Sequence, residues 1–116
     1  MNRAVLLALT VLGATPCAQG GENRANDFLL AQTELARAMR LGGVVGEGCY
    51  PDRVFYGGMG ARGVARDQGF WSVRCSNGRS YMVDVRPDGT SNVLSCAVLE
   101  AFRAGRCFAP MPGATR

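Results

Sequence analysis

The chain has 116 residues, 47% of them hydrophobic, and a formal net charge of +4, which is enough for one small domain. All thirteen basic residues are arginine, and there is neither histidine nor lysine. This excludes histidine-based nucleophile pairs, histidine zinc ligands, haem attachment through Cys-x-x-Cys-His and Schiff-base lysines. We therefore expect a non-catalytic protein without a cofactor, and the modest positive charge does not indicate a nucleic-acid partner.

The first twenty residues have the three parts of a secretory signal peptide. Met1-Asn2-Arg3 supplies positive charge, residues 4–14 are apolar, and Ala18-Gln19-Gly20 is a small-x-small cleavage site. The apolar run is too short to span a bilayer comfortably, and no later segment could anchor the chain. We predict removal of residues 1–20 and a periplasmic or secreted protein. A core helix or an uncleaved anchor is the alternative.

Cys17 follows the apolar run, where a bacterial lipoprotein carries its lipid. Thr15-Pro16 is unlike the residues that precede such a cysteine, so we expect Cys17 to leave with the signal peptide. Lipidation and a retained odd thiol are the alternatives.

The first element predicted in the mature chain is a helix capped by Asn26, with Asp27 in its first turn. Gly42-Gly43 is expected to end it. Its apolar positions recur at helical spacing: Phe28, Ala31, Leu35, Ala38 and Met39. This predicts one amphipathic helix of about four turns that packs on a sheet, with a partner-binding helix as the alternative.

Residues 44–69 are rich in glycine. Tyr50-Pro51-Asp52 predicts a turn and Arg53–Tyr56 a short edge strand. Gly58–Gly63 matches the dinucleotide fingerprint G-x-G-x-x-G, but no helix pattern opens inside it. We therefore predict a flexible loop over Gly57–Gly63.

Residues 70–96 read as three antiparallel strands. Asn77-Gly78 predicts a hairpin with positive φ at both turn residues, and Pro87-Asp88-Gly89 predicts a type I turn closed by a bulge. A third strand follows over Thr90–Ser95.

The alternation of side chains predicts two partly apolar faces if the second turn has three loop residues. One face would contain Trp71, Val73, Cys75, Met82, Leu94 and Cys96, and the other Phe70, Tyr81, Val83, Val85 and Val93. A two-residue second turn would move the last strand to the opposite face.

Helices or loops covering both faces would explain this pattern, and so would a partner bound to one aromatic face. The candidate partner surface consists of Trp71, Tyr81, Arg74, Arg62 and Arg66. Its arginines would attract an anion or an acidic partner segment, although scattered, solvated charge is the simpler explanation. Asp84, which lies in the middle of a strand, is interpreted as an arginine partner, with a buried general acid as the alternative.

Four cysteines remain after signal removal, and they predict two disulfides. Of the three possible pairings we favour Cys49–Cys75 with Cys96–Cys107. Cys107 lies one short helix beyond Cys96, whereas Cys75 and Cys96 are two strands apart, about 10 Å. An envelope thiol-redox or metal-binding protein is the alternative, although no Cys-x-x-Cys is present.

Ser95 is expected to cap a helix over Cys96–Ala104 that Gly105 terminates. Residues 109–116 contain proline and glycine and predict a disordered tail, which leaves a single domain over residues 21–108.

One helix followed by a meander that carries Trp71–Cys75, Asn77-Gly78, Tyr81, Cys96 and Cys107-Phe108 resembles small exported proteins of proteobacteria. The arrangement is similar to the PepSY type of helix-plus-sheet module over residues 26–108. The resemblance implies binding or inhibition of peptidases and assigns no site residues. We expect an α+β fold, with two helices on a three- or four-stranded antiparallel sheet, and a binding or inhibitory module for an envelope protein or peptide.

Overall fold

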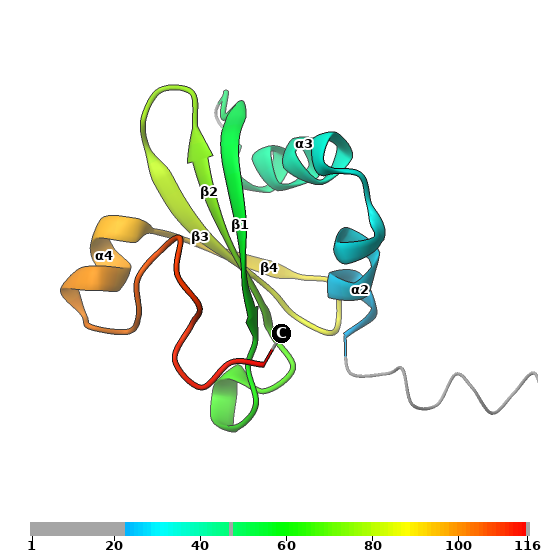
Figure 1. Cartoon of the computed structure of the whole chain (residues 1–116), viewed down its shortest axis with the longest axis vertical. Coiled ribbons are helices and arrows are strands. Elements are labelled where there is room, and N and C mark those ends of the chain that lie inside the picture. Colours follow the sequence, from blue (N-terminus) through cyan, green and yellow to red (C-terminus); the bar gives the residue numbers. More distant parts are fainter. Residues whose placement is uncertain (1–22, 47, 116) are drawn as a thin grey trace, which may run out of the picture.

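The structure is a computed structural model that describes residues 23–46 and 48–115. The signal-peptide and Cys17 predictions lie outside these residues. Helices and a four-stranded antiparallel sheet of order β1-β2-β3-β4 confirm the α+β class (Figure 1). The elements are α2 (Arg24–Ala31), α3 (Glu34–Val45), β1 (Pro51–Met59), the 3₁₀ turn η2 (Gly63–Ala65), β2 (Gly69–Cys75), β3 (Ser80–Val85), β4 (Ser91–Ser95) and α4 (Cys96–Ala101).

Both faces of the sheet are covered. Helices α2 and α3 lie on one side, and α4 with the C-terminal segment lies on the other (Figure 1). The α2–α3 face buries Leu29, Leu41, Trp71, Val73, Val83 and Val85. The α4 face buries Phe70, Met82, Cys96, Leu99 and Cys107. Two small cores therefore replace one large core, and each depends on side chains from only a few elements.

The hairpin at Asn77-Gly78 is present, but its register differs from the prediction. The Cys75 N–H donates to the Arg79 carbonyl (2.8 Å), so the loop has three residues, and only its last residue, Gly78, has positive φ (90°). Trp71 consequently pairs with Val83, and Ser72 with Met82. The predicted face that joined Trp71 to Met82 is wrong, because one additional loop residue moves every β3 side chain to the opposite face.

The turn between β3 and β4 has the predicted three loop residues. The Arg86 N–H donates to the Thr90 carbonyl (2.9 Å), and Gly89 has φ 91°. Met82 therefore pairs with Leu94, as expected for a three-residue loop.

Asp88 in this turn should make the free energy of unfolding decrease as the pH falls into the acid range. The Thr90 hydroxyl, and after it the Thr90 backbone N–H, hold the pKa of the Asp88 carboxyl below its usual 3.8. A lowered pKa stabilises the folded state above the usual value, and this is lost as the pH falls through the lowered pKa. Asp88→Asn should therefore lower the unfolding temperature slightly at pH 7, and the difference from the wild type should vanish in strong acid. Thermal unfolding from pH 7 to pH 2 measures this, and a difference that stays constant would contradict it.

Two helices replace the single predicted helix. Asn23 caps α2 and Thr33 caps α3, with a break at Gln32, and α3 continues through Gly42-Gly43 to Val45, where Gly46 (φ 83°) is the C-cap. Gly42 does not end the helix but lets it approach β1, since a Cβ there would lie 2.7 Å from Pro51 Cδ. The predicted buried face is also wrong. Leu29 and Leu41 are buried, whereas the apolar side chains of the predicted face that remain exposed are Phe28, Leu35 and Met39.

Strand β1 includes part of the predicted flexible loop, and the C-terminal segment covers its far end. The Met111 N–H donates to the Gly57 carbonyl (3.0 Å), and Met59 and Thr115 exchange two backbone hydrogen bonds (2.6 and 2.8 Å). Residues 109–115 therefore belong to the folded domain, contrary to the disordered tail expected from their composition. Gly58 lies within β1, and the motif is followed by the three-residue 3₁₀ turn η2 and then by β2, so no α-helix follows it as a dinucleotide site requires.

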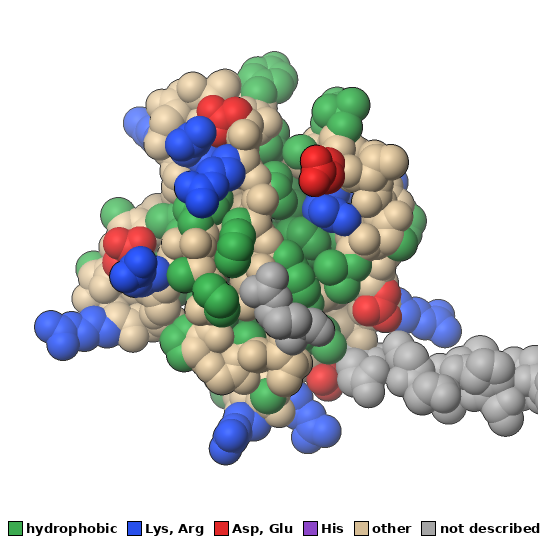
Figure 2. Space-filling model, viewed as in Figure 1, with side chains coloured by type: hydrophobic (Ala, Val, Ile, Leu, Met, Phe, Trp, Pro, Cys, Tyr) green, Lys and Arg blue, Asp and Glu red, His purple; other side chains and the backbone are tan. Residues whose placement is uncertain are grey.

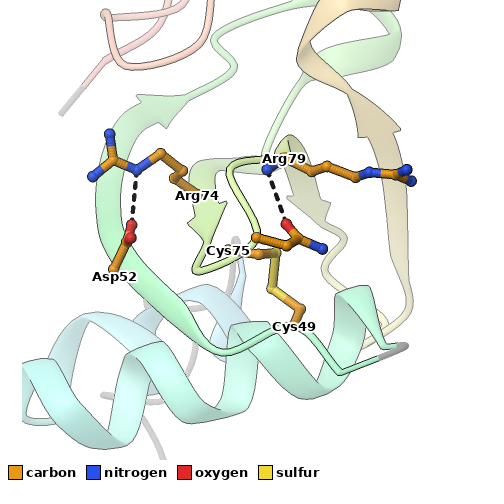
Figure 3. Close-up of a disulfide and its surroundings, with 6 residues drawn as sticks. Cys49, Asp52, Arg74, Cys75 and Arg79 are labelled. Carbon is orange, nitrogen blue, oxygen red and sulfur yellow. Dashed lines mark hydrogen bonds and ion pairs between the residues drawn. A yellow bond between two sulfur atoms is a disulfide. The ribbon is translucent and has the colours of Figure 1, made fainter.

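Both predicted disulfides are confirmed. Cys49–Cys75 joins the segment after α3 to the end of β2 (Figure 3), and Cys96–Cys107 joins α4 to the C-terminal segment. Ser95 caps α4 through its hydroxyl, which accepts from the Val98 N–H (3.2 Å), but the helix ends at Ala101, earlier than predicted.

Candidate functional site: a groove between α3 and β1

Two buried asparagines position the base of the site. Asn23 caps α2 and donates to the Asp67 and Val85 carbonyls (2.7 and 2.8 Å). Asn26 accepts from Trp71 Nε1 (2.7 Å) and donates to the Tyr56 hydroxyl (3.0 Å). Every buried side-chain polar atom in the described residues has a partner. The network therefore fixes the indole ring by hydrogen bonds as well as by packing.

Arg37 connects this network to the helices. Its guanidinium lies 5.3 Å from the centre of the Trp71 ring and donates to the carbonyls of Leu29, Leu30 and Gln32 (2.9–3.0 Å). These carbonyls end α2, where a cation is favourable because of the helix dipole. The same side chain thus terminates α2, orients α3 and covers the tryptophan, which explains the break that periodicity did not predict.

A groove of about 510 Å³ lies between α3 and β1. Trp71, Tyr56 and Val54 from the sheet and Leu35 and Ala38 from α3 provide its apolar lining. The Tyr56 and Trp71 rings are packed with their centres 4.6 Å apart. Charged side chains also line it: Glu34, Arg37, Asp52 and Arg53. Figure 2 shows this hollow between the strands and α3, with hydrophobic side chains along it and charged ones near its rim.

The edge of β1 contributes backbone groups to the groove. The Cys75 N–H bonds to β3, and the backbone groups of successive residues in a strand point alternately to its two sides. Ser72 and Arg74 therefore direct their backbone groups to β1, where their partners are Phe55 and Arg53. Val54 lies between these partners, so its N–H and C=O point away from β2. No other described strand pairs with β1 at Val54. Farther along the same edge, Gly57 and Met59 already bond to residues 111–115.

The predicted partner surface is not assembled. Trp71 is 1% exposed beneath α2 and α3, and Tyr81 is half-buried on the same face. Arg74 lies on the opposite face and pairs with Asp52 (2.8 Å; Figure 3), whereas Arg62 and Arg66 lie exposed in the loop before β2. The prediction is therefore wrong as a single surface, because alternation along β2 separates Trp71 from Arg74 and the aromatic side is covered.

Sequence reasoning missed Arg37, Glu34 and Tyr56. Arg37 is not among the apolar positions that predict one continuous helix, and the break after Ala31 changes the direction in which it points. The pair Asn23 and Asn26, three residues apart at a helix start, is the sequence signal that could have indicated a buried cap.

Asp84 does not pair with an arginine in the described residues. Its carboxylate accepts from the Asn92 N–H (3.1 Å) on the neighbouring strand and lies half-buried. This contact fixes the start of β4 and leaves the charge at the sheet surface, so it gives no indication of a general acid.

The cysteines form no thiol site in this state, because all four in the described residues are paired. No group of three or more potential metal-ligating His, Cys, Asp or Glu side chains occurs within residues 23–46 and 48–115. In the same residues, no helix is long and apolar enough to cross a membrane.

These features define a small α+β domain with two disulfides, a class typical of oxidising compartments. Comparisons of the chain with protein-family models, with curated proteins and with solved structures found no match.

Proposed function

We propose that this protein is an exported, non-catalytic binding or inhibitory module of the cell envelope that holds an extended polypeptide segment in the groove between α3 and β1. The observation that carries the proposal is the groove itself, where apolar side chains from a helix and a strand face one another beside the outward backbone groups of Val54. Export is supported by the signal-like first twenty residues and by the disulfides.

The groove suits an extended segment for three reasons. The outward N–H and C=O of Val54 offer main-chain hydrogen bonds of the kind that a strand adds to a sheet edge. Leu35 and Ala38 on one wall and Tyr56 on the other leave space for an apolar side chain. Residues 111–115 already bond to the same edge as an added segment, so the edge accepts backbone partners without rearrangement.

The acidic and basic side chains around the groove would select among such segments. Glu34 stands at the start of α3 and Asp52 at the start of β1, with Arg53 beside it. Asp52 is engaged by Arg74 and Arg53 lies over the Phe108 ring (4.2 Å), which leaves Glu34 as the carboxylate without an ion pair among the described lining residues. We expect selected segments to carry an apolar residue followed or preceded by an arginine or lysine. The PepSY-like arrangement makes envelope peptidases the first partners to examine.

Ala38→Arg tests this proposal because it places a long side chain in the groove wall. We expect peptides selected from a random library on the wild type to bind Ala38→Arg at least about tenfold more weakly, or about 1.4 kcal/mol. Trp71 is the single tryptophan and lines the groove, so its fluorescence provides the titration signal.

Met39→Arg is the matched control, since Met39 is the next residue of α3, is exposed and does not line the groove. It should bind the peptides as the wild type does. Equal binding by Ala38→Arg and the wild type would refute the groove as the site, and failure to select any peptide would refute the class of ligand.

A further inference from the structure

The two edge strands of the sheet, β1 and β4, differ in how much of their outer edge is covered. The edge of β1 is partly covered by residues 111–115, whereas no other described residue pairs with the outer edge of β4. Since the Arg86 N–H bonds to Thr90, alternation directs the backbone groups of Asn92 and Leu94 toward β3 and those of Ser91, Val93 and Ser95 outward. The outer edge of β4 therefore presents the unpaired backbone groups of Ser91 and Val93, whereas the carbonyl of Ser95, the N-cap of α4, accepts the first bond of that helix.

The β4 strand also lacks the features that usually protect an edge. It has no charged residue, no proline and no bulge against β3. Its two central apolar side chains, Val93 and Leu94, are 39% and 41% exposed, one on each face of the sheet. An open edge of this kind favours pairing with another strand.

Apolar surface continues on both sides of the edge. On the α4 face, a hollow of about 370 Å³ beside Leu94 reaches Met82 and Phe70, and Val98 and Phe102 of α4 are exposed. On the α2–α3 face, a hollow of about 400 Å³ reaches Ser91 from Phe28 and Val44. Arg40, which lies 4.7 Å from the centre of the Phe28 ring, is the charged side chain among the described residues that line it. A strand added to β4 would thus have apolar surface to bury above and below the sheet.

We propose that the edge of β4 is a homodimer interface, in which a second copy of the chain adds its own β4 antiparallel to the first about a two-fold axis at Val93. In this register Val93 exchanges both outward hydrogen bonds with Val93 of the second copy, and Ser91 lies opposite Ser95. The segment Ser91–Ser95 has a serine at each end and a valine at its centre, so the pattern of outward residues is the same in both directions. An isologous contact places each residue opposite the one equally far from the axis, so Asn92 lies opposite Leu94 of the second copy.

Charge favours a second copy at this edge. From residue 21 onward the chain has twelve arginines against nine Asp and Glu, a net charge of +3. Two such chains repel each other less where their contact surface carries few arginines. Residues 91–99 contain no charged side chain, whereas Asp52 and Arg53 stand at the start of β1. Because β1 and β4 are opposite edges of the sheet, the dimer is a continuous sheet across both copies with β1 at its two outer edges. The inference does not depend on what the groove binds.

Sedimentation velocity on the disulfide-intact exported protein measures the fractions of monomer and dimer. The protein concentration is varied from about 1 to 500 µM, a range that covers the dissociation constants of weak specific contacts. The wild type should form a dimer within this range. Val93→Arg should raise its dissociation constant at least about tenfold, because like charges would face each other across the axis. Val64→Arg adds the same charge at a residue that is 97% exposed in the loop before β2, and should leave dimerisation unchanged.

Amide hydrogen exchange on the wild type gives a second test that needs no substitution. The Val93 amide should become protected as the protein concentration rises, whereas the Leu94 amide, which bonds within the sheet, should be protected at all concentrations. A monomer throughout the range would overturn the proposal, and so would a dimer that persists in folded Val93→Arg. Protection of Val93 that appears only when a different protein is added would also overturn it and assign the edge to a foreign strand.

Discussion

Replacing Trp71 with alanine should destabilise the fold by about 3–5 kcal/mol, a large part of the stability of a small domain. The side chain is 1% exposed and packs between Tyr56, Arg37 and the α2–α3 core. Its removal leaves a cavity that rigid strands on one side and a disulfide-linked helix segment on the other cannot close. Urea unfolding followed by far-ultraviolet circular dichroism measures the loss, since the only tryptophan is absent from the variant.

Trp71→Phe separates packing from hydrogen bonding in the same experiment. Phenylalanine keeps most of the aromatic surface but leaves Asn26 Oδ1, which is buried, without its donor. We expect a cost of about 1–3 kcal/mol from the unsatisfied acceptor and the lost volume together. Equal losses for the two variants would show that the hydrogen bond dominates, and a loss below about 1 kcal/mol for Trp71→Ala would contradict the proposed role of the ring.

Removing the Cys49–Cys75 disulfide should have the second largest effect. The relation between loop length and chain entropy assigns about 3.5 kcal/mol to a bridge across 26 residues and about 2.8 kcal/mol to one across 11. The Cys49→Ala/Cys75→Ala variant should therefore unfold at lower urea concentration than Cys96→Ala/Cys107→Ala, which serves as its matched control.

The two disulfide variants should also differ in how tightly the groove between α3 and β1 binds peptides. Cys75 pairs with Pro51, and Pro51 and Asp52 line the end of the groove nearest the Cys49–Cys75 bridge. Loss of the Cys49–Cys75 bridge should weaken peptide binding, whereas loss of the Cys96–Cys107 bridge on the α4 face should not. The reverse order, in stability or in binding, would refute this account.

Local chemistry made much of the sheet predictable. Turn residues located both hairpins, and the separation of Cys75 from Cys96 by two strands correctly favoured the observed disulfide pairing. Ser95 correctly predicted the start of α4 because a hydroxyl cap acts within three residues. The register after Asn77-Gly78 was not predictable in this way, since two- and three-residue loops both accept Asn-Gly and differ only in how the next strand faces the core.

The groove was not predictable, because long-range contacts create it. Arg37 ends α2 by bonding to carbonyls five to eight residues earlier, and Gly42 serves contact with Pro51 instead of ending a helix. Similarly, residues 109–115 have the composition of a disordered tail, and only the edge of β1 gives their backbone groups partners. These elements depend on tertiary partners that no local pattern specifies.

The connectivity of the two disulfides has a consequence for how the molecule matures. Each bridge joins neighbours among the four cysteines of the described residues, so the two disulfide loops do not overlap along the chain. If Cys17 leaves with the signal peptide, as we propose, Cys49 and Cys75 emerge before Cys96, and each correct partner is the next thiol to arrive. Pairing in order of arrival thus yields the native bridges without thiol–disulfide exchange. Maturation then requires an oxidant that removes two electrons from each pair, but no catalyst to reshuffle wrong ones.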